Sequence, residues 1–266
     1  MTINFKIKKE KRKGFNGSAS VSYGQGRYPK TNNSLSLNKR TKNLNVFGNY
    51  SFAYREGFNR LILDRSFYEN GLYDGAYDQN NFLKMTFRNH LARGGADYMM
   101  NDKHTLGILV SGVMNNFDPN GNNSSDVYDE TTAKVSRFET RSRSKERWKN
   151  GSLNLNYKFV IDTTGTELTA DFDYAAYGNR NKQDFNTLYF NLDGSPLQPD
   201  YKLHGNLRGD LDIYAMKSDF VTFTKNKIKV ETGIKSSYGR ADNNLGAAST
   251  ITIFKSRSGW ILAKPK

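Results

Sequence analysis

Apolar and polar positions alternate along much of the chain with a period of two residues. In residues 44–54 the even positions are Leu, Val, Gly, Tyr, Phe and Tyr, whereas the odd positions are mostly Asn, Ser and Ala. Residues 153–161, 168–176 and 228–235 show the same alternation. Because successive side chains of a strand point to opposite faces, this pattern predicts β-strands with one apolar and one polar face.

The pattern predicts nine strands. Several of them run to about ten residues, which exceeds the usual five or six of soluble sheets. A tilted strand that crosses a bilayer needs about 9–11 residues, so these lengths match a membrane span. The predicted strands are 14–24, 32–40, 44–55, 82–100, 105–116, 151–161, 166–177, 210–223 and 228–238.

Short and long connections between these strands alternate. The short ones are Arg40–Asn43, Asn101–His104, Asp162–Gly165 and Thr224–Lys227, and the long ones are Gly24–Asn32, Glu56–Asn81, Phe117–Asn150 and Gly178–Gly209. Outer-membrane barrels have short periplasmic turns and long extracellular loops. We therefore predict an all-β fold, an antiparallel up-and-down meander that forms part of a large transmembrane β-barrel and is an open, curved sheet in isolation.

Composition agrees with strands and excludes a helical membrane protein. Mean hydropathy is −0.76 and 25% of the residues are charged. The longest nearly apolar stretch, Leu106–Met114, is about half of the roughly 20 residues that a spanning helix needs. Aromatic residues are abundant, with 16 Tyr and 17 Phe, and there is no Cys, which removes disulfides and thiolate metal sites. The net charge of +14 indicates an anionic partner.

The apolar face of the predicted strands supplies a candidate membrane surface. Tyr and Phe recur near strand ends, as in the aromatic girdles of membrane barrels, and Tyr23 and Tyr177 are included among them. The residues that we expect to face lipid or to form the girdle are Val46, Tyr50, Phe52, Tyr54, Tyr98, Ile108, Val110, Leu155, Tyr157, Phe159, Phe172, Tyr174, Phe220 and Val230. Asp171, Asp173, Lys217, Asp219, Lys229, Glu231 and Lys235 are expected on the opposite, inward face.

No set of residues predicts catalysis, a cofactor or a metal site. His90, His104 and His204 are far apart and share no ligand spacing, and His104 lies in a predicted turn. The calcium-like loop Asp118–Asp129 has Asn at its sixth position and Asp at its twelfth, so we expect a polar extracellular loop there. The glycines at 24 and 26 lead into another strand, which predicts a turn and not a phosphate-binding loop. We expect that the protein is not an enzyme.

Five segments together resemble the outer-membrane β-barrel family typical of Bacteroidetes, whose members are built like TonB-dependent receptors. They are residues 3–38, 45–59, 95–112, 150–159 and 165–174, with phrases such as NVFGNYSFAYREGFN and GTELTADFDY. The resemblance implies a location in the bacterial outer membrane, with outer-membrane lipid and lipopolysaccharide as partners. It also implies uptake of a substrate, of unknown identity, with a plug domain and an inner-membrane energising complex as partners and no role for nucleic acid.

The resemblance divides the chain into three parts. Residues 1–13 correspond to the end of a plug and its linker, 14–245 to a partial barrel, and 246–266 to an atypical tail. With no visible signal peptide and an odd strand count, we expect a fragment of a receptor or transporter. The alternatives are a soluble, basic all-β module that binds polysaccharide or nucleic acid, and a small structural outer-membrane barrel.

Overall fold

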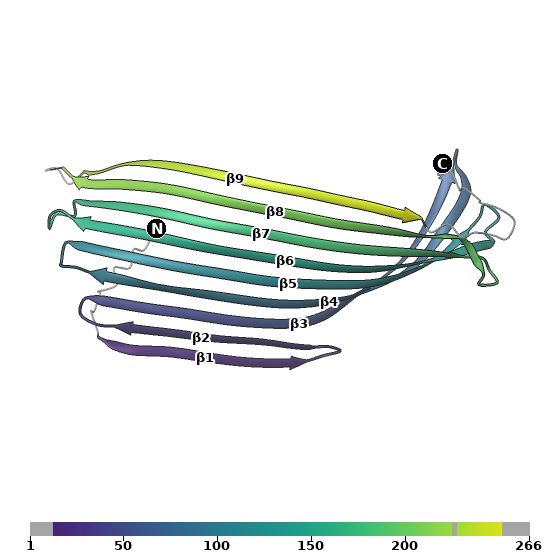
Figure 1. The fold of residues 1–266 in the computed structure, drawn as a ribbon, viewed down its shortest axis with the longest axis horizontal. Coiled ribbons are helices and arrows are strands. Elements are labelled where there is room, and N and C mark those ends of the chain that lie inside the picture. The colour runs from purple at the N-terminus through teal and green to yellow at the C-terminus, as the bar shows by residue number, and fades with distance from the viewer. Residues whose placement is uncertain (1–12, 225–227, 252–266) are drawn as a thin grey trace.

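The computed structural model describes residues 13–224 and 228–251. This part of the chain forms nine β-strands in one antiparallel sheet, and each strand pairs with its neighbours in the sequence (Figure 1). The strands are β1 (Gly14–Gln25), β2 (Pro29–Arg40), β3 (Leu44–Glu69), β4 (Leu72–Met99), β5 (His104–Tyr128), β6 (Lys134–Val160), β7 (Glu167–Phe190), β8 (Pro196–Phe223) and β9 (Lys229–Ile251). The predicted all-β meander and its strand count are confirmed.

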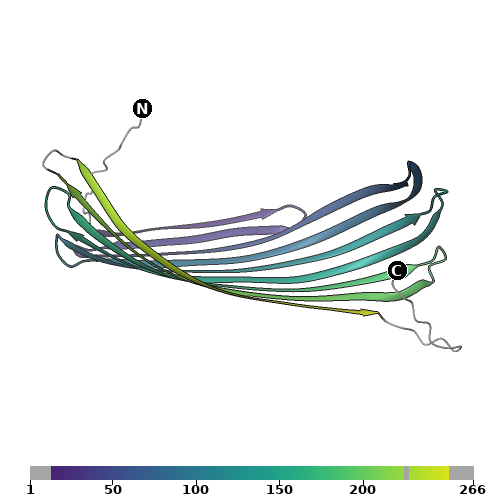
Figure 2. The same ribbon diagram turned by 90° about the horizontal axis from the view of Figure 1, so that it is seen from above.

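The sheet is curved and twisted and does not close on itself (Figures 1 and 2). Within the described residues, β1 pairs only with β2 and β9 pairs only with β8. Both edge strands therefore present one row of backbone groups without a partner strand in the described part of the chain.

One end of the sheet, called the proximal end here, carries the four predicted short connections. They join β2 to β3, β4 to β5, β6 to β7 and β8 to β9, as expected. Asp162 organises the third of them, because its carboxylate accepts hydrogen bonds from the Thr164 amide at 2.8 Å and the Thr166 amide at 3.1 Å. Hydrogen bonds from the side chains of Thr164 and Thr166 hold the pKa of Asp162 well below its ordinary value.

The predicted long segment Gly24–Asn32 is a short connection at residues 26–28, between β1 and β2. The other three predicted long loops, at the opposite, distal end, are wrong. Strands β3 to β8 continue through these segments and are 24 to 28 residues long. The connection between β3 and β4 is the two-residue turn Asn70–Gly71, whose φ angles of 50° and 82° are those of a type I′ hairpin turn. These segments form strands in spite of their loop-like composition, because the backbone N–H and C=O groups of each strand find hydrogen-bond partners on the neighbouring strand.

Pro119 marks the one irregularity within β5 that the sequence signalled. The segment Asp118–Gly121, which we expected in a loop, lies inside the strand, and Pro119 pairs with Met85 of β4. On the other side, the pairing with β6 passes from Phe117 opposite Glu146 to Asn120 opposite Arg143. Proline has no N–H to donate, so the ladder is interrupted at this point while the strand goes on.

The expected divisions of the chain at 13 and 245 remain predictions. Residues 1–12, most of the proposed plug junction, and 252–266, most of the proposed tail, lie outside the described residues. The part of the tail that is described is continuous with β9, which runs to Ile251. No helix in the described residues is long and apolar enough to span a membrane.

Candidate functional site

The register of the sheet places all fourteen predicted membrane-facing residues on one face, called the outward face. Val46 lies in the same cross-strand row as Ala96, Ile108, Leu155 and Phe172. The other members follow at even spacing from this row along their own strands, from Tyr50, Phe52 and Tyr54 on β3 to Phe220 and Val230 on β8 and β9. Tyr177 is an exception among the aromatic candidates, because it pairs with Asn150 and Leu211 on the opposite, inward face.

The apolar side chains of the outward face are open to solvent. Ile108 is 44% exposed, Val110 52% and Met216 62%, and the described residues contain no buried hydrophobic side chain. Exposure of such a surface to water is unfavourable, by about 25 cal/mol for each Å² of apolar area. A chain of this size with its apolar residues spread over one open face needs an apolar surrounding medium.

The apolar outward side chains form a belt that begins at the proximal end. On β5 it extends from His104 to Gly112, a span of nine residues, which matches the length that crosses a bilayer. Aromatic residues border it on both sides. Tyr157 and Phe159 lie at the proximal border, with His104 stacked on Phe159 at 4.5 Å, and Tyr174 stacks on Tyr214 at 4.8 Å toward the distal border.

The inward face behind this belt is polar. The Asn154 amide donates to Asp173 at 2.7 Å, and the hydroxyls of Ser111 and Ser152 are 2.7 Å apart. The charged residues that we expected on this face are there, since Asp171, Lys217 and Lys235 form one cross-strand row. Gly107 is fully covered, because a Cβ atom there would lie 2.4 Å from the Asn156 side chain. One face of the same strand segment therefore suits lipid, and the other suits water or a polar domain.

The two faces exchange their polarity in the distal half of the strands. Beyond the belt, the outward side chains of β6 are Lys149, Arg147, Lys145, Arg143 and Arg141. The inward side chains there include large apolar rings, with Phe87 stacked on Phe117 at 4.2 Å. Phe138 of the same face lies 6.0 Å from Tyr77 and 6.2 Å from Tyr189. Sequence reasoning missed this surface because it treated these segments as loops.

Comparison with known families identifies the class of protein. Residues 159–259 match the outer membrane protein beta-barrel family, and this range contains β7, β8 and β9. Together with the open, two-faced antiparallel sheet, the match decides the location. The chain is a bacterial outer-membrane protein. No curated protein and no solved structure matches it.

The histidines of this outer-membrane protein have ordinary polar partners. His90 lies 2.8 Å from the Tyr50 hydroxyl, and His204 lies 2.6 Å from Asp184. His104, expected in a turn, is the first residue of β5, and its Nδ1 lies 2.6 Å from the Tyr157 hydroxyl. In the described part of the chain no three His, Asp or Glu side chains are grouped as metal ligands would be.

The calcium-like segment of this outer-membrane protein is not a loop, which corrects the expectation for Asp118–Asp129. Asp118, Asn120 and Asn122 lie on β5 and point outward in one line. Asp118 is engaged by arginines, with Arg147 at 2.7 Å and Arg88 at 3.6 Å. The carboxylate therefore serves to hold guanidinium groups on the outward face.

Proposed function

We propose that this chain forms part of the wall of a large outer-membrane receptor barrel that takes up a substrate, as TonB-dependent receptors do. The observation that carries the proposal is the polar inward face behind the apolar belt. Charged side chains such as Asp173 and Lys217 need water or a polar partner, because an unpaired charge in an apolar interior is strongly unfavourable. A wide lumen that contains water or a plug domain provides both.

The shape of the sheet supports a large barrel. In barrels of about eight strands, side chains fill the interior, whereas the largest ones hold a plug in the lumen. Here nine strands in the described residues leave β1 and β9 as separate edges of an open curve (Figure 2). Further strands are needed to pair these edges, and a wall of this kind then surrounds a lumen wider than side chains alone can fill.

The proposed partners of the inward face are a plug domain and, through it, an inner-membrane energising complex. Small side chains at Ser111 and Ser152 leave room for a domain to approach the wall closely. The protein then acts by transport and not by catalysis, and we assign no catalytic residue. The lack of a buried hydrophobic core in the described residues disfavours the alternative of a soluble polysaccharide- or nucleic-acid-binding module.

Single cysteines test energy-driven uptake, because the natural chain contains no Cys and gives no background. In intact cells, we expect Ser152→Cys, on the inward face, to react with a small water-soluble maleimide at a rate that falls when a protonophore removes the energy source. Leu155→Cys, on the outward face, serves as the control and should react slowly in both conditions. A Ser152→Cys rate that is the same with and without the protonophore would contradict a plug that moves under energy.

A further inference from the structure

The outward face just beyond the belt carries an unusual alignment of positive charge. Every second residue of β6 from Arg141 to Lys149 is Lys or Arg, and all of them point outward. The adjacent strands extend this surface with Arg180 and Lys182 on β7 and Arg208 on β8. We call the set the cationic band; it comprises Arg141, Arg143, Lys145, Arg147, Lys149, Arg180, Lys182 and Arg208.

Like charges face each other directly within the band. Arg147 is the cross-strand partner of Arg180, and Arg180 is the partner of Arg208. Lys145 is likewise opposite Lys182. The Cβ atoms of directly opposed residues are about 4.5–5.5 Å apart, and like charges at that spacing destabilise a sheet. Something with negative charge is needed to offset this repulsion.

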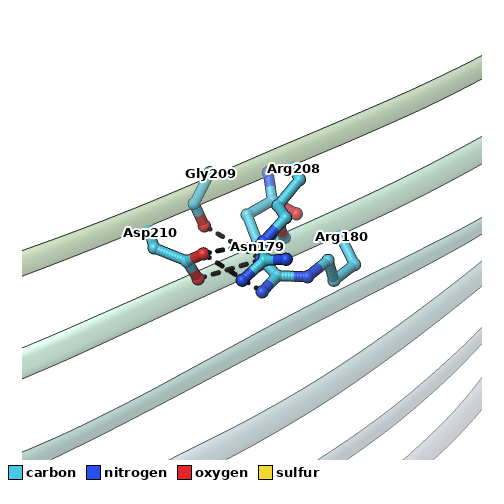
Figure 3. A network of polar contacts seen from close by, with 5 residues as sticks. All are labelled: Asn179, Arg180, Arg208, Gly209 and Asp210. Atoms are coloured by element: carbon cyan, nitrogen blue, oxygen red, sulfur yellow. Dashed lines mark hydrogen bonds and ion pairs between the residues drawn. The ribbon is translucent and has the colours of Figure 1, made fainter. Parts of the chain in front are cut away.

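Two aspartates supply part of the offset, and each of them lies between two arginines. Arg180 forms a bidentate pair with Asp210 at 2.9 and 3.1 Å, and the Nε atom of Arg208 donates to the same carboxylate at 2.9 Å (Figure 3). Asp118 is shared between Arg147 and Arg88 in the same way. Each aspartate neutralises one of its two arginines and holds both guanidinium groups in fixed positions. The Asp118 cluster keeps a net positive charge, whereas Asp242, opposite Asp210, offsets the remaining charge of the other cluster.

The other cations of the band have no such partner. Arg141, Arg143, Lys145, Lys149 and Lys182 are exposed, and none of them forms an ion pair with a described carboxylate. Asp184 lies opposite Arg143 in the register, but its carboxylate contacts His204. The band is therefore a strongly positive surface with unused hydrogen-bond donors.

The height of the band relative to the belt identifies the medium that it meets. The belt ends at a cross-strand row of small residues, Ala92, Gly112, Gly151 and Ala176. Lys149 lies on the same face, two residues from Gly151 toward the distal end, which is about 7 Å along the strand. This row also lines a shallow hollow whose rim includes Tyr50 and Lys149. Cations directly beyond an apolar belt lie at the level of lipid headgroups.

We propose that the cationic band binds the phosphate groups of lipopolysaccharide in the outer leaflet, with the adjoining hollow against the lipid's sugar and acyl portion. Outer-membrane barrels have short periplasmic turns and longer segments on the extracellular side. Because β6, β7 and β8 extend far beyond the belt only at the distal end, we assign that end to the extracellular side. Continuity with the belt favours a lipid over a soluble polyanion. The proposal depends on the outer-membrane location and is independent of substrate uptake.

The test is binding of bisphosphorylated lipid A to the full chain in neutral detergent micelles. Arg143→Gln/Lys145→Gln/Lys182→Gln removes three charges whose loss leaves no carboxylate unpaired. We expect this variant to bind the lipid at least tenfold more weakly, and we expect Arg143→Lys to bind it as the natural chain does. Lys39→Gln/Lys42→Gln/Lys103→Gln, with the same charge loss at the proximal end, is the matched control and should bind normally.

Three results would overturn the proposal. They are equal binding of dephosphorylated lipid A, equal loss of binding in the proximal control variant, and binding of soluble inositol hexakisphosphate as tight as that of the lipid. Far-UV circular dichroism of each variant verifies that the strands are retained. If the triple variant does not fold, Lys145→Gln/Lys182→Gln replaces it, and unchanged lipid binding by that folded variant also overturns the proposal.

Discussion

The proximal and distal halves of the same strands have opposite polarity. In the proximal half of β6 the outward residues are apolar, such as Leu153 and Leu155, and the inward ones are Asn154 and Asn156. In the distal half the outward residues are Arg and Lys, whereas Trp148 and Phe138 are inward. The ladder of backbone pairs to β7 is continuous through both halves. The difference shows that backbone pairing maintains the strand in both halves, whereas the polarity of the side chains on each face matches the medium around that half.

The largest effect is expected from a charge placed in the belt. Leu155→Arg puts a cation on the outward face where lipid is expected, and it should destabilise the folded state by about 2–4 kcal/mol. The same change at Ser124, which is outward in the distal half and opposite Glu139, should alter stability by less than about 0.5 kcal/mol. Urea unfolding in phospholipid vesicles measures both. An equal loss of folding stability at the two positions would contradict the difference in surrounding medium between the two halves.

A smaller effect is expected from the inward aromatic surface of the distal half. Phe117→Ala removes the ring that stacks on Phe87 at 4.2 Å, and we expect a loss of about 1–2 kcal/mol because both rings are only half-buried. Phe117→Leu retains most of the apolar area and should lose less than half of that. The same unfolding measurement applies, and a neutral Phe117→Ala would show that this surface does not stabilise the sheet.

A still smaller effect is expected from the aspartate between two arginines. Asp210→Asn leaves Arg180 and Arg208 opposite each other without a carboxylate between them. The pair is partly exposed, so the loss should be below about 1 kcal/mol and should shrink as salt screens the repulsion. Unfolding at 0.02 M and 0.5 M salt measures this dependence. A loss that is independent of salt would argue against repulsion as its cause.

The smallest effect is a pH dependence at the proximal turn, outside the belt. The pKa of Asp162 is lowered in the folded state by its hydrogen bonds, so its contribution to stability is complete above the unfolded value of about 3.9. That contribution is lost as the pH falls below this value toward the folded pKa. Asp162→Asn should therefore show a flatter stability profile between about pH 5 and 2 than the natural chain. Identical profiles would show that Asp162 does not titrate with folding.

The sequence predicted the proximal half well and the distal half poorly, for a physical reason. Alternation in residues 44–54 or 153–161 has a constant phase, so both the strands and their apolar face could be inferred. Past Gly112 and Gly151 the phase reverses, and segments rich in Asn, Asp and Ser resemble loops. The dipeptide Asn70–Gly71, with apolar and aromatic residues on both sides, was the signal that marked a hairpin in place of a long loop.

The candidate surfaces divide in the same way. All fourteen predicted outward residues share a face because period two is a local property of a strand. The arginine alignment across β6, β7 and β8 depends on register within segments that the sequence pattern presents as long connections, such as Arg180 with Arg208. Strand periodicity alone gives no register across long connections, so this cluster required the structure.

Spin labels on β6 test whether the polarity of the two faces follows lipid in the proximal half and water in the distal half. Single cysteines at Leu155, Asn154 and Lys145 are labelled in the full chain in lipid vesicles, and the collision rates with oxygen and with a water-soluble nickel complex are compared. We expect oxygen-dominated collisions at 155 and nickel-dominated collisions at 154 and 145. Nickel-dominated collisions at 155, or oxygen-dominated collisions at 145, would contradict this expectation.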